Sequence, residues 1–225
     1  MRIILLGPPG SGKGTQGDLV SRAFGFPRVS TGDILRQAVR DRTPLGLQAE
    51  AMMNQGALVS DDIVLELVRQ RIAQPDCRRG YILDGFPRTV RQAEALEKTD
   101  SGRVELALEF QVDAEVLIQR LGARQVCPKC HAVYNLDIQP PRKPGSCDVC
   151  GVTLVRRKDD RPEVIAERLA VYGREAEPLR AFYVARESYA AIDASGSMAE
   201  VFDLVKAGVE SVLSAAGSRP DGGRG

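Results

Sequence analysis

Long apolar runs are missing from this 225-residue chain. A helix needs about 20 consecutive apolar residues to cross a bilayer, and no stretch approaches that length. The N-terminal run from Ile3 to Leu6 is also too short for the core of a secretory signal. We therefore expect no membrane span and a cytoplasmic location.

The chain also has almost no excess of charge of one sign. It carries 31 Lys and Arg against 30 Asp and Glu, a formal net charge of +1. A protein that relies on overall basicity to hold nucleic acid or an anionic membrane needs a clear positive excess, so we expect neither partner. A balanced total still allows local basic clusters. With 43% hydrophobic and 27% charged residues, the composition is that of one folded globular domain, or of one domain with an insertion.

Histidine is nearly absent: the only one, His131, lies between four cysteines. A catalytic histidine elsewhere in the chain is therefore excluded. The four cysteines form two Cys-x-x-Cys pairs with 16 residues between the pairs, a spacing typical of a four-thiolate zinc site, and a site with four protein ligands is structural. The ligands would be Cys127, Cys130, Cys147 and Cys150.

Two other readings of the cysteines stay open. The pairs could form disulfides, although reduced cytosolic thiols favour metal binding, and His131 could replace one cysteine as a ligand. The fifth cysteine, Cys77, stands apart, and we expect an inert thiol there.

Strand-like and helix-like segments alternate along the chain, which indicates βαβ units and a mainly parallel sheet flanked by helices. Strands are expected at 2–7, 27–29, 80–84, 104–112 and 190–193. Gly25 and Gly56 are placed to end helices, and Ser30 and Ser60 are placed to begin them. Pro178 is expected to kink or divide a helix that starts after Pro162. The segment between the first and last paired cysteines breaks this alternation and predicts an inserted β module, and 215–225 predicts a disordered tail.

A glycine-rich loop follows the first strand and opens a helix: Gly7-Pro-Pro-Gly-Ser-Gly-Lys-Gly-Thr15. In this context the backbone N–H groups turn toward a phosphate, and Lys13 would reach the β- and γ-phosphates. The general motif has Ser or Thr directly after the lysine, where its hydroxyl binds the metal. Here Gly14 occupies that position and the hydroxyl comes one residue later, at Thr15. We therefore expect the metal to be held differently.

This form of the loop resembles that of the adenylate kinase family. Three further stretches support the resemblance, which runs in order from the N-terminus to about residue 213. They are Ser30-Thr-Gly-Asp33 with Arg36, Leu83-Asp-Gly-Phe-Pro-Arg88 with Gln92, and Arg157-Lys-Asp-Asp160 with Arg168. The resemblance implies a P-loop core, a small helical insertion for the nucleoside monophosphate and a lid over the donor, with the reaction MgATP + AMP ⇌ 2 ADP.

The resemblance also implies roles for individual residues. It assigns the donor ATP to Gly10, Ser11, Gly12, Lys13, Gly14, Thr15, Arg120, Arg124, Val133, Tyr134 and Ser197. It assigns AMP to Thr31, Arg36, Ala57, Leu58, Val59, Gly85, Phe86, Pro87, Arg88, Gln92, Arg157 and Arg168. Phosphoryl transfer itself is assigned to Lys13, Asp84, Arg88, Arg124, Arg157 and Arg168, with Arg156 left as an alternative to its neighbour.

Asp84 follows an apolar strand, where α/β sheets place ligand groups. A carboxylate suits Mg²⁺, which prefers oxygen ligands and keeps several waters, so we expect Asp84 to bind the Mg²⁺ of MgATP through water. An AMP phosphate oxygen is already ionised at neutral pH, so the attack needs no general base. Alignment and charge neutralisation are then left to Lys13, the arginines and the metal.

The resemblance implies a core at 1–29, 60–121 and 160–225, an acceptor-binding insertion at 30–59, and a zinc-bearing lid at 122–159, in a monomer. Two other functions stay open. A kinase for a different nucleoside monophosphate would differ around Thr31, 57–59 and Gln92. A zinc-knuckle nucleic-acid protein that merely carries a P-loop would need a basic face and salt-dependent binding.

Overall fold

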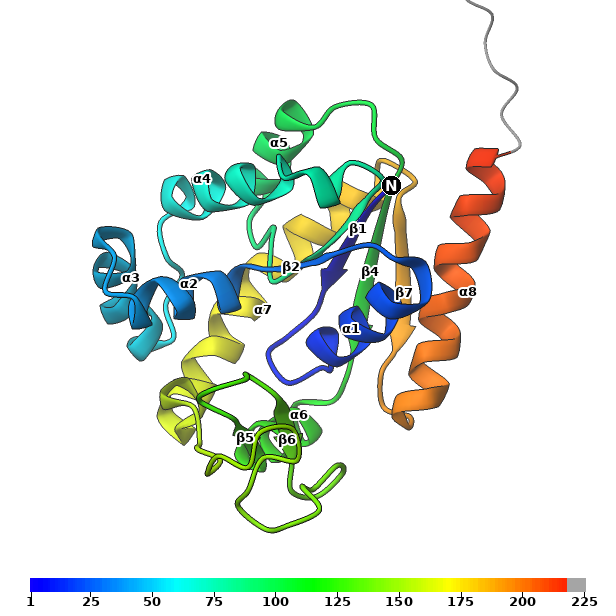
Figure 1. Ribbon diagram of the computed structural model, residues 1–225. Helices are drawn as coiled ribbons and strands as arrows, with labels where there is room; N and C mark the ends of the chain where they lie inside the picture. Colours follow the sequence, from blue (N-terminus) through cyan, green and yellow to red (C-terminus); the bar gives the residue numbers. More distant parts are fainter. Residues whose placement is uncertain (218–225) are drawn as a thin grey trace, which may run out of the picture.

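The computed structural model describes residues 1–217 and has a five-stranded parallel sheet at its centre (Figure 1). The strand order is β2-β3-β1-β4-β7, and every pairing is parallel. The strands are β1 (Arg2–Leu6), β2 (Arg28–Ser30), β3 (Tyr81–Asp84), β4 (Glu105–Gln111) and β7 (Tyr189–Asp193). The five predicted strands are thus confirmed, each to within a residue or two.

Helices cover both faces of this sheet, because alternate residues of its strands point to opposite sides. Ile4 of β1 packs in one core cluster with residues of α4 (Asp61–Ile72), α5 (Val90–Thr99) and α7 (Pro162–Val184). Its neighbour Ile3 packs in a second cluster with residues of α1 (Lys13–Phe24) and α8 (Met198–Gly217). The mainly parallel α/β fold predicted from the alternation is confirmed.

Several helix signals act as expected. Gly25 takes a left-handed conformation at the end of α1, and Gly56 does the same at the end of α3 (Pro44–Gln55). The side chain of Ser30 accepts a hydrogen bond from the backbone N–H of Asp33 and caps α2 (Thr31–Arg40).

Three local expectations need correction. Ser60 precedes α4, but its side chain makes no capping bond; acidic side chains in the first turn supply favourable charge there instead. Of the two outcomes expected at Pro178, division is wrong: α7 continues to Val184, where buried Leu179 and Tyr183 hold its last turns against the core. Residues 215–217 belong to α8 rather than to a disordered tail. The remainder of that predicted tail, 218–225, lies outside the described residues.

Two parts stand away from the sheet (Figure 1). The first is the pair α2 and α3, which pack on each other. The second follows α6 (Ala114–Gly122) and contains the antiparallel hairpin of β5 (Arg124–Val126) and β6 (Val133–Asn135), ending at the short helix η2 (Lys158–Asp160). A further short helix, η1 (Pro75–Cys77), precedes β3. The β module expected between Cys127 and Cys150 is confirmed in part: β6 lies in that segment, whereas β5 precedes it. The division into domains stays a prediction.

None of the described helices is long and apolar enough to cross a membrane.

A buried carboxylate fastens α7 and β7 to the centre of the sheet. Glu109 of β4 accepts hydrogen bonds from Tyr172 Oη at 2.8 Å, Tyr189 Oη at 2.6 Å and Arg180 Nε at 2.7 Å. Burial alone would raise the pKa of Glu109, but these hydrogen bonds, led by that of Arg180, hold the pKa below its ordinary value. The ionised form is therefore the one that stabilises the fold.

We predict that Glu109→Gln lowers the free energy of unfolding by about 2–4 kcal/mol near pH 7, because it removes one partner of a buried ion pair. Since the folded pKa is lowered, this contribution is present above the unfolded pKa of about 4.3 and is lost as pH falls through the folded value. Urea unfolding between pH 3 and pH 8 measures both effects. Glu177→Gln, which removes the exposed partner of Arg180, should cost less than about 0.5 kcal/mol; equal losses in the two variants would contradict the assignment.

Candidate active site

The glycine-rich loop connects β1 to the N-terminus of α1, at the carboxyl end of the central strand. Gly7 and Gly10 have φ angles of 134° and 86°. A Cβ on Gly7 would come within 2.8 Å of the carbonyl oxygen of Phe110, and one on Gly10 within 2.9 Å of Leu121 Cγ. The loop can therefore lie this close to its surroundings only because these positions are glycine. A loop that leads into a helix N-terminus can turn backbone N–H groups toward an anion.

Lys13 folds back over this loop. Its Nζ donates to the carbonyl oxygens of Gly7 and Pro8, both at 2.7 Å, and to Ser11 Oγ at 3.2 Å. Burial lowers the pKa of Lys13 to about 7; Asp84 opposes the shift, and nearby arginines add to it. A phosphate beside Lys13 would restore its positive charge, so the lysine is poised for an anion.

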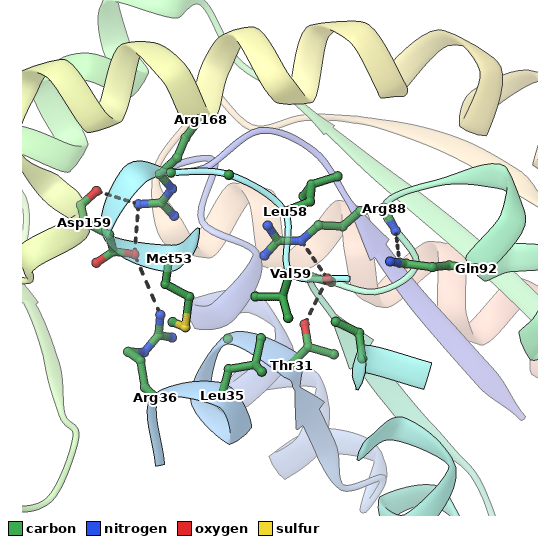
Figure 2. Close-up of a pocket in the computed structure, with 15 residues that line it drawn as sticks. Thr31, Leu35, Arg36, Met53, Leu58, Val59, Arg88, Gln92, Asp159 and Arg168 are labelled. Carbon is green, nitrogen blue, oxygen red and sulfur yellow. Dashed lines mark hydrogen bonds and ion pairs between the residues drawn. The ribbon is translucent and has the colours of Figure 1, made fainter. Parts of the chain in front are cut away.

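Asp160 collects two of the predicted arginines. Its side chain is fully buried, and it accepts a two-pronged contact from Arg124, with Nε at 2.8 Å, and a contact from Arg168 Nη1 at 3.3 Å. Arg168 Nη1 also lies 3.2 Å from Asp159 Oδ2, and Arg36 Nη1 lies 3.9 Å from the same oxygen (Figure 2). Arginines of β5, α2 and α7 thus meet at two neighbouring carboxylates.

Like charges crowd this part of the molecule. Burial lowers the pKa of Arg88, and Arg168 and Arg36 lower it further. Burial also lowers the pKa of Arg157, with Arg124 and Arg36 adding to the effect. Guanidinium groups stay protonated in proteins, so these shifts record first the cost of burying a positive charge and then the repulsion between neighbouring arginines. A bound anion would offset both.

The structure separates Arg157 from its neighbour. Arg157 is half-buried and lines the large cleft beside the glycine-rich loop, whereas Arg156 is exposed and does not line it.

A pocket between α2, the end of α3 and the segment after β3 brings together most of the predicted AMP residues (Figure 2). Thr31 Oγ1 and Arg88 Nε both donate to the carbonyl oxygen of Gly85 at 2.9 Å. The predicted residues that line the pocket are Thr31, Arg36, Ala57, Leu58, Val59, Gly85, Arg88, Gln92 and Arg168. Phe86 is instead fully buried in the core, and Pro87 lines the larger cleft.

Gln92 is almost completely buried at the pocket wall. Its Oε1 accepts from the backbone N–H of Arg88 at 2.8 Å, and its Nε2 donates to Asp61 Oδ1 at 2.6 Å. An amide has two donor hydrogens and two lone pairs on oxygen, so one of each is left for a ligand. The protein contacts fix the direction in which the amide presents them.

The larger cleft extends from the glycine-rich loop under the β5–β6 hairpin. It is lined by the whole predicted donor set: Gly10, Ser11, Gly12, Lys13, Gly14, Thr15, Arg120, Arg124, Val133, Tyr134 and Ser197. Arg120 donates through Nη1 to the carbonyl oxygen of Ala194 at 3.1 Å, while its buried Nε has no partner among the described residues. The backbone N–H of Ser197 donates to Glu200 at 2.8 Å, and its carbonyl oxygen accepts from Val201. A second lone pair on that oxygen is left for a ligand.

Asp84 closes β3 directly beside the loop. A Cβ on Gly14 would lie 3.5 Å from Asp84 Oδ2, so the carboxylate faces the position where the general loop motif has its metal-binding hydroxyl. Arg28 Nη1 donates to the same oxygen at 2.8 Å. A half-buried carboxylate beside a phosphate loop fits a water-mediated Mg²⁺ ion.

The four paired cysteines gather in the hairpin, with all Sγ atoms within 4.8 Å of one another. Cys127 Sγ lies 3.3 Å from Cys150 Sγ, and Cys130 Sγ lies 3.4 Å from Cys147 Sγ. Zinc–sulfur bonds of about 2.3 Å in a tetrahedron put sulfur atoms about 3.8 Å apart, so the cluster fits such an ion. All four are free thiols, against the disulfide alternative.

His131 is not part of this cluster. Its Nε2 lies 3.3 Å from Arg40 Nη2 of α2. Its backbone φ of 63° matches the 71° of Gly151, and each of these residues directly follows the second cysteine of its pair. The histidine therefore occupies a turn position, and the four-cysteine set is the one brought together.

Three acidic residues near the arginines were missing from the sequence-predicted site. Asp159 and Asp160 organise Arg36, Arg124 and Arg168, and Asp33 accepts from Arg36 at 2.6 Å. The only signal for the first two was their position two and three residues after Arg157 in the Arg-Lys-Asp-Asp stretch, because an acidic residue that positions an arginine resembles an ordinary surface charge in sequence.

The parallel sheet, the glycine-rich loop at a helix N-terminus and the crowd of cations define a P-loop phosphate-binding protein of the α/β class. The family model "Adenylate kinase" matches residues 5–188. The chain belongs to the adenylate kinase family.

Curated relatives agree with this over nearly the whole chain. An adenylate kinase of Clostridium novyi (strain NT) is 43% identical over 213 residues, covering 93% of this chain and 99% of the relative. One from Trichlorobacter lovleyi is 45% identical over 210 residues, covering 92% and 98%. One from Clostridium perfringens (strain SM101) is 43% identical over 208 residues, covering 91% and 96%.

Proposed function

We propose that this chain, an adenylate kinase that transfers a phosphoryl group from ATP to AMP, aligns the two nucleotides across a shared wall of arginines. The single observation behind this proposal is that the smaller pocket and the larger cleft have Arg36, Arg88 and Arg168 in common. Phosphates entering from the two sides would meet there. The reaction is MgATP + AMP ⇌ 2 ADP, which balances the adenine nucleotides of the cell.

In this proposal the donor phosphates lie on the loop from Gly10 to Thr15, with Lys13 turning from the carbonyl oxygens of Gly7 and Pro8 onto the β- and γ-phosphates. Arg120 and Ser197 flank the donor base, and Val133 and Tyr134 cover the donor from the hairpin. Arg124 and Arg157 come down on the transferred group from the lid side.

The AMP phosphate lies between Arg36 and Arg88, which grip it bidentately as lysines could not. Thr31 and the backbone from Ala57 to Val59 enclose the nucleoside, and Gln92 presents its remaining donor and acceptor to the adenine edge. Gly85 and Pro87 form the floor between the two sites, while Phe86 supports that floor from the core.

Charge neutralisation and alignment would supply the catalysis. Asp84 would hold the Mg²⁺ of MgATP through water, and the ion neutralises charge on the β- and γ-phosphates. No base is required because the attacking phosphate oxygen is already ionised. This agrees with the position of His131 on a turn of the hairpin, where it contacts Arg40.

We also propose that the insertion at 30–59 and the lid at 122–159 close over the core at 1–29, 60–121 and 160–225 to exclude water, since water in the site would hydrolyse ATP. The four cysteines would hold a structural Zn²⁺ ion that stiffens the lid internally. The protein would act as a cytoplasmic monomer, with nucleotides as its only partners and neither nucleic acid nor membrane involved.

The acceptor is the first thing to test. ADP formation from ATP is measured with AMP, CMP, UMP and GMP in turn. AMP should be preferred by at least about 100-fold in kcat/KM, because the Gln92 amide can pair fully with the hydrogen-bonding edge of adenine but not with that of another base. Equal rates with another monophosphate would instead assign the chain to that substrate. Binding of nucleic acid without any transfer would reject the enzyme altogether.

Arg88 provides the sharpest test of the shared wall. We predict that Arg88→Ala or Lys13→Met each lowers kcat/KM by at least about 100-fold, near 3 kcal/mol, because each removes a charge that faces the transition state. Arg156→Ala removes an equally charged but exposed side chain and should stay within about threefold of wild type. Near-wild-type kinetics in the Arg88 variant would defeat the assignment.

The zinc proposal predicts a difference between stability and activity. Cys127→Ser should lower the melting temperature more than it lowers activity at moderate temperature, because the ion supports the lid and does not touch substrate. Cys77→Ser, a lone buried thiol outside the cluster, is the matched control and should keep its zinc. Metal analysis of freshly purified protein should give about one zinc per chain; its absence would remove the metal from the proposal.

A further inference from the structure

The side chain of Arg28 lies across α1 in a groove made by two missing side chains. Gly14 and Gly17 lie one turn apart on that helix. A Cβ on Gly17 would come within 2.7 Å of Arg28 Cδ, and one on Gly14 within 3.6 Å of Arg28 Nη1. These two glycines therefore give the guanidinium its path to the phosphate loop.

The guanidinium then contacts three carboxylates with three different nitrogens. Nη1 lies 2.8 Å from Asp84 Oδ2, Nη2 lies 3.2 Å from Asp33 Oδ2, and Nε lies 2.7 Å from Asp18 Oδ1. The Arg28 side chain is only 22% exposed. Within residues 1–217 the carboxylate of Asp84 is bonded only through Oδ2, so its other oxygen is left for a ligand.

The position of this contact is informative. It lies against Gly14, the place where the general loop motif has a metal-binding hydroxyl. Here that place contains the carboxylate of Asp84, a group of the kind that binds metal ions, and the positive charge of Arg28 lies on the same carboxylate oxygen. A divalent cation approaching Asp84 alone would meet the repulsion of Arg28, whereas one carried by a triphosphate would bring compensating negative charge.

We propose that Arg28 is a positioning residue whose single positive charge partly compensates Asp84 and Asp33 in the nucleotide-free protein, so that a divalent cation enters the site only together with the triphosphate. The inference rests on the proposed role of Asp84 toward Mg²⁺. It explains why one arginine spans both carboxylates: their charges are held in place and compensated until the phosphates arrive. Asp33 also forms an ion pair with Arg36, so an arginine proposed to bind AMP shares this carboxylate with Arg28.

Mn²⁺ is the probe, because the electron paramagnetic resonance signal of the free ion reports binding without any turnover. In nucleotide-free full-length protein at pH 7, Arg28→Gln should bind Mn²⁺ at least about tenfold more tightly than wild type, equivalent to about 1.4 kcal/mol. Adding a non-hydrolysable ATP analogue should shrink the difference to less than about threefold, since the phosphates then dominate the charge. Mn²⁺ should also raise the melting temperature of Arg28→Gln more than that of wild type.

Three variants keep the test sharp. Arg22→Gln removes the same charge from an exposed position of α1 and should leave Mn²⁺ affinity within about twofold of wild type. Asp84→Asn added to Arg28→Gln should abolish the gain. Arg28→Lys keeps the charge but loses the planar guanidinium that spans two carboxylates, so its Mn²⁺ affinity should lie between those of wild type and Arg28→Gln. It also replaces Arg28→Gln in the test if that variant does not fold.

Two results would overturn the inference: unchanged affinity for free Mn²⁺ in both Arg28 variants, or a gain that survives Asp84→Asn. The proposed magnesium role of Asp84 is tested separately by Asp84→Asn in the presence of the ATP analogue. Unchanged Mn²⁺ binding there would reject that role, and the proposal for Arg28 with it. If Asp84→Asn loses Mn²⁺ binding in the presence of the analogue but the Arg28 variants bind free Mn²⁺ as wild type does, only the proposal for Arg28 is rejected.

Discussion

The charged centre of this molecule depends on one buried carboxylate, that of Asp160. Arg124 and Arg168 would repel each other if they approached without it, and neither could be held at the cleft wall in a fixed direction. The fully buried Asp160 takes one arginine from the hairpin side and one from α7. Its neighbour Asp159 extends the arrangement to Arg36 on α2. The positive wall is therefore built around a negative centre, which lets cations gather without a bound nucleotide.

Backbone shape is the second constraint. The phosphate loop lies so close to β4 and α6 that side chains at Gly7 and Gly10 would collide with Phe110 and Leu121. The same lack of side chains on α1 gives Arg28 its groove. Glycine therefore acts in two ways in one short stretch: it allows the loop to face phosphate, and it admits a charge that compensates the acids beside the loop.

Local chemistry explains why so much could be predicted. The glycine-rich loop, the two cysteine pairs and the capping residues are short-range patterns with a direct physical meaning, and the strand at 80–84 led to Asp84 at the correct sheet edge. What escaped were effects of tertiary contacts: the continuation of α7 through Pro178, the helical residues 215–217, and the partners Asp159, Asp160 and Arg28. An ion pair between segments more than 50 residues apart, such as Arg28 with Asp84, leaves no spacing pattern in a single sequence.

The attachment of α7 by Glu109 has a consequence for the logic of the enzyme. That contact fixes α7 to the sheet through Tyr172 and Arg180, so Arg168, on the same helix, belongs to the stationary frame. Arg36 lies on α2 and Arg124 on β5, which the proposed division of the chain places in the acceptor insertion and in the lid. Arg36 and Arg124 contact the two carboxylates beside this fixed arginine before any nucleotide is bound. Under the proposed closure, moving either part away would break the ion pair that its arginine makes with Asp159 or Asp160, so these ion pairs would contribute to the free-energy cost of opening the site to admit a nucleotide.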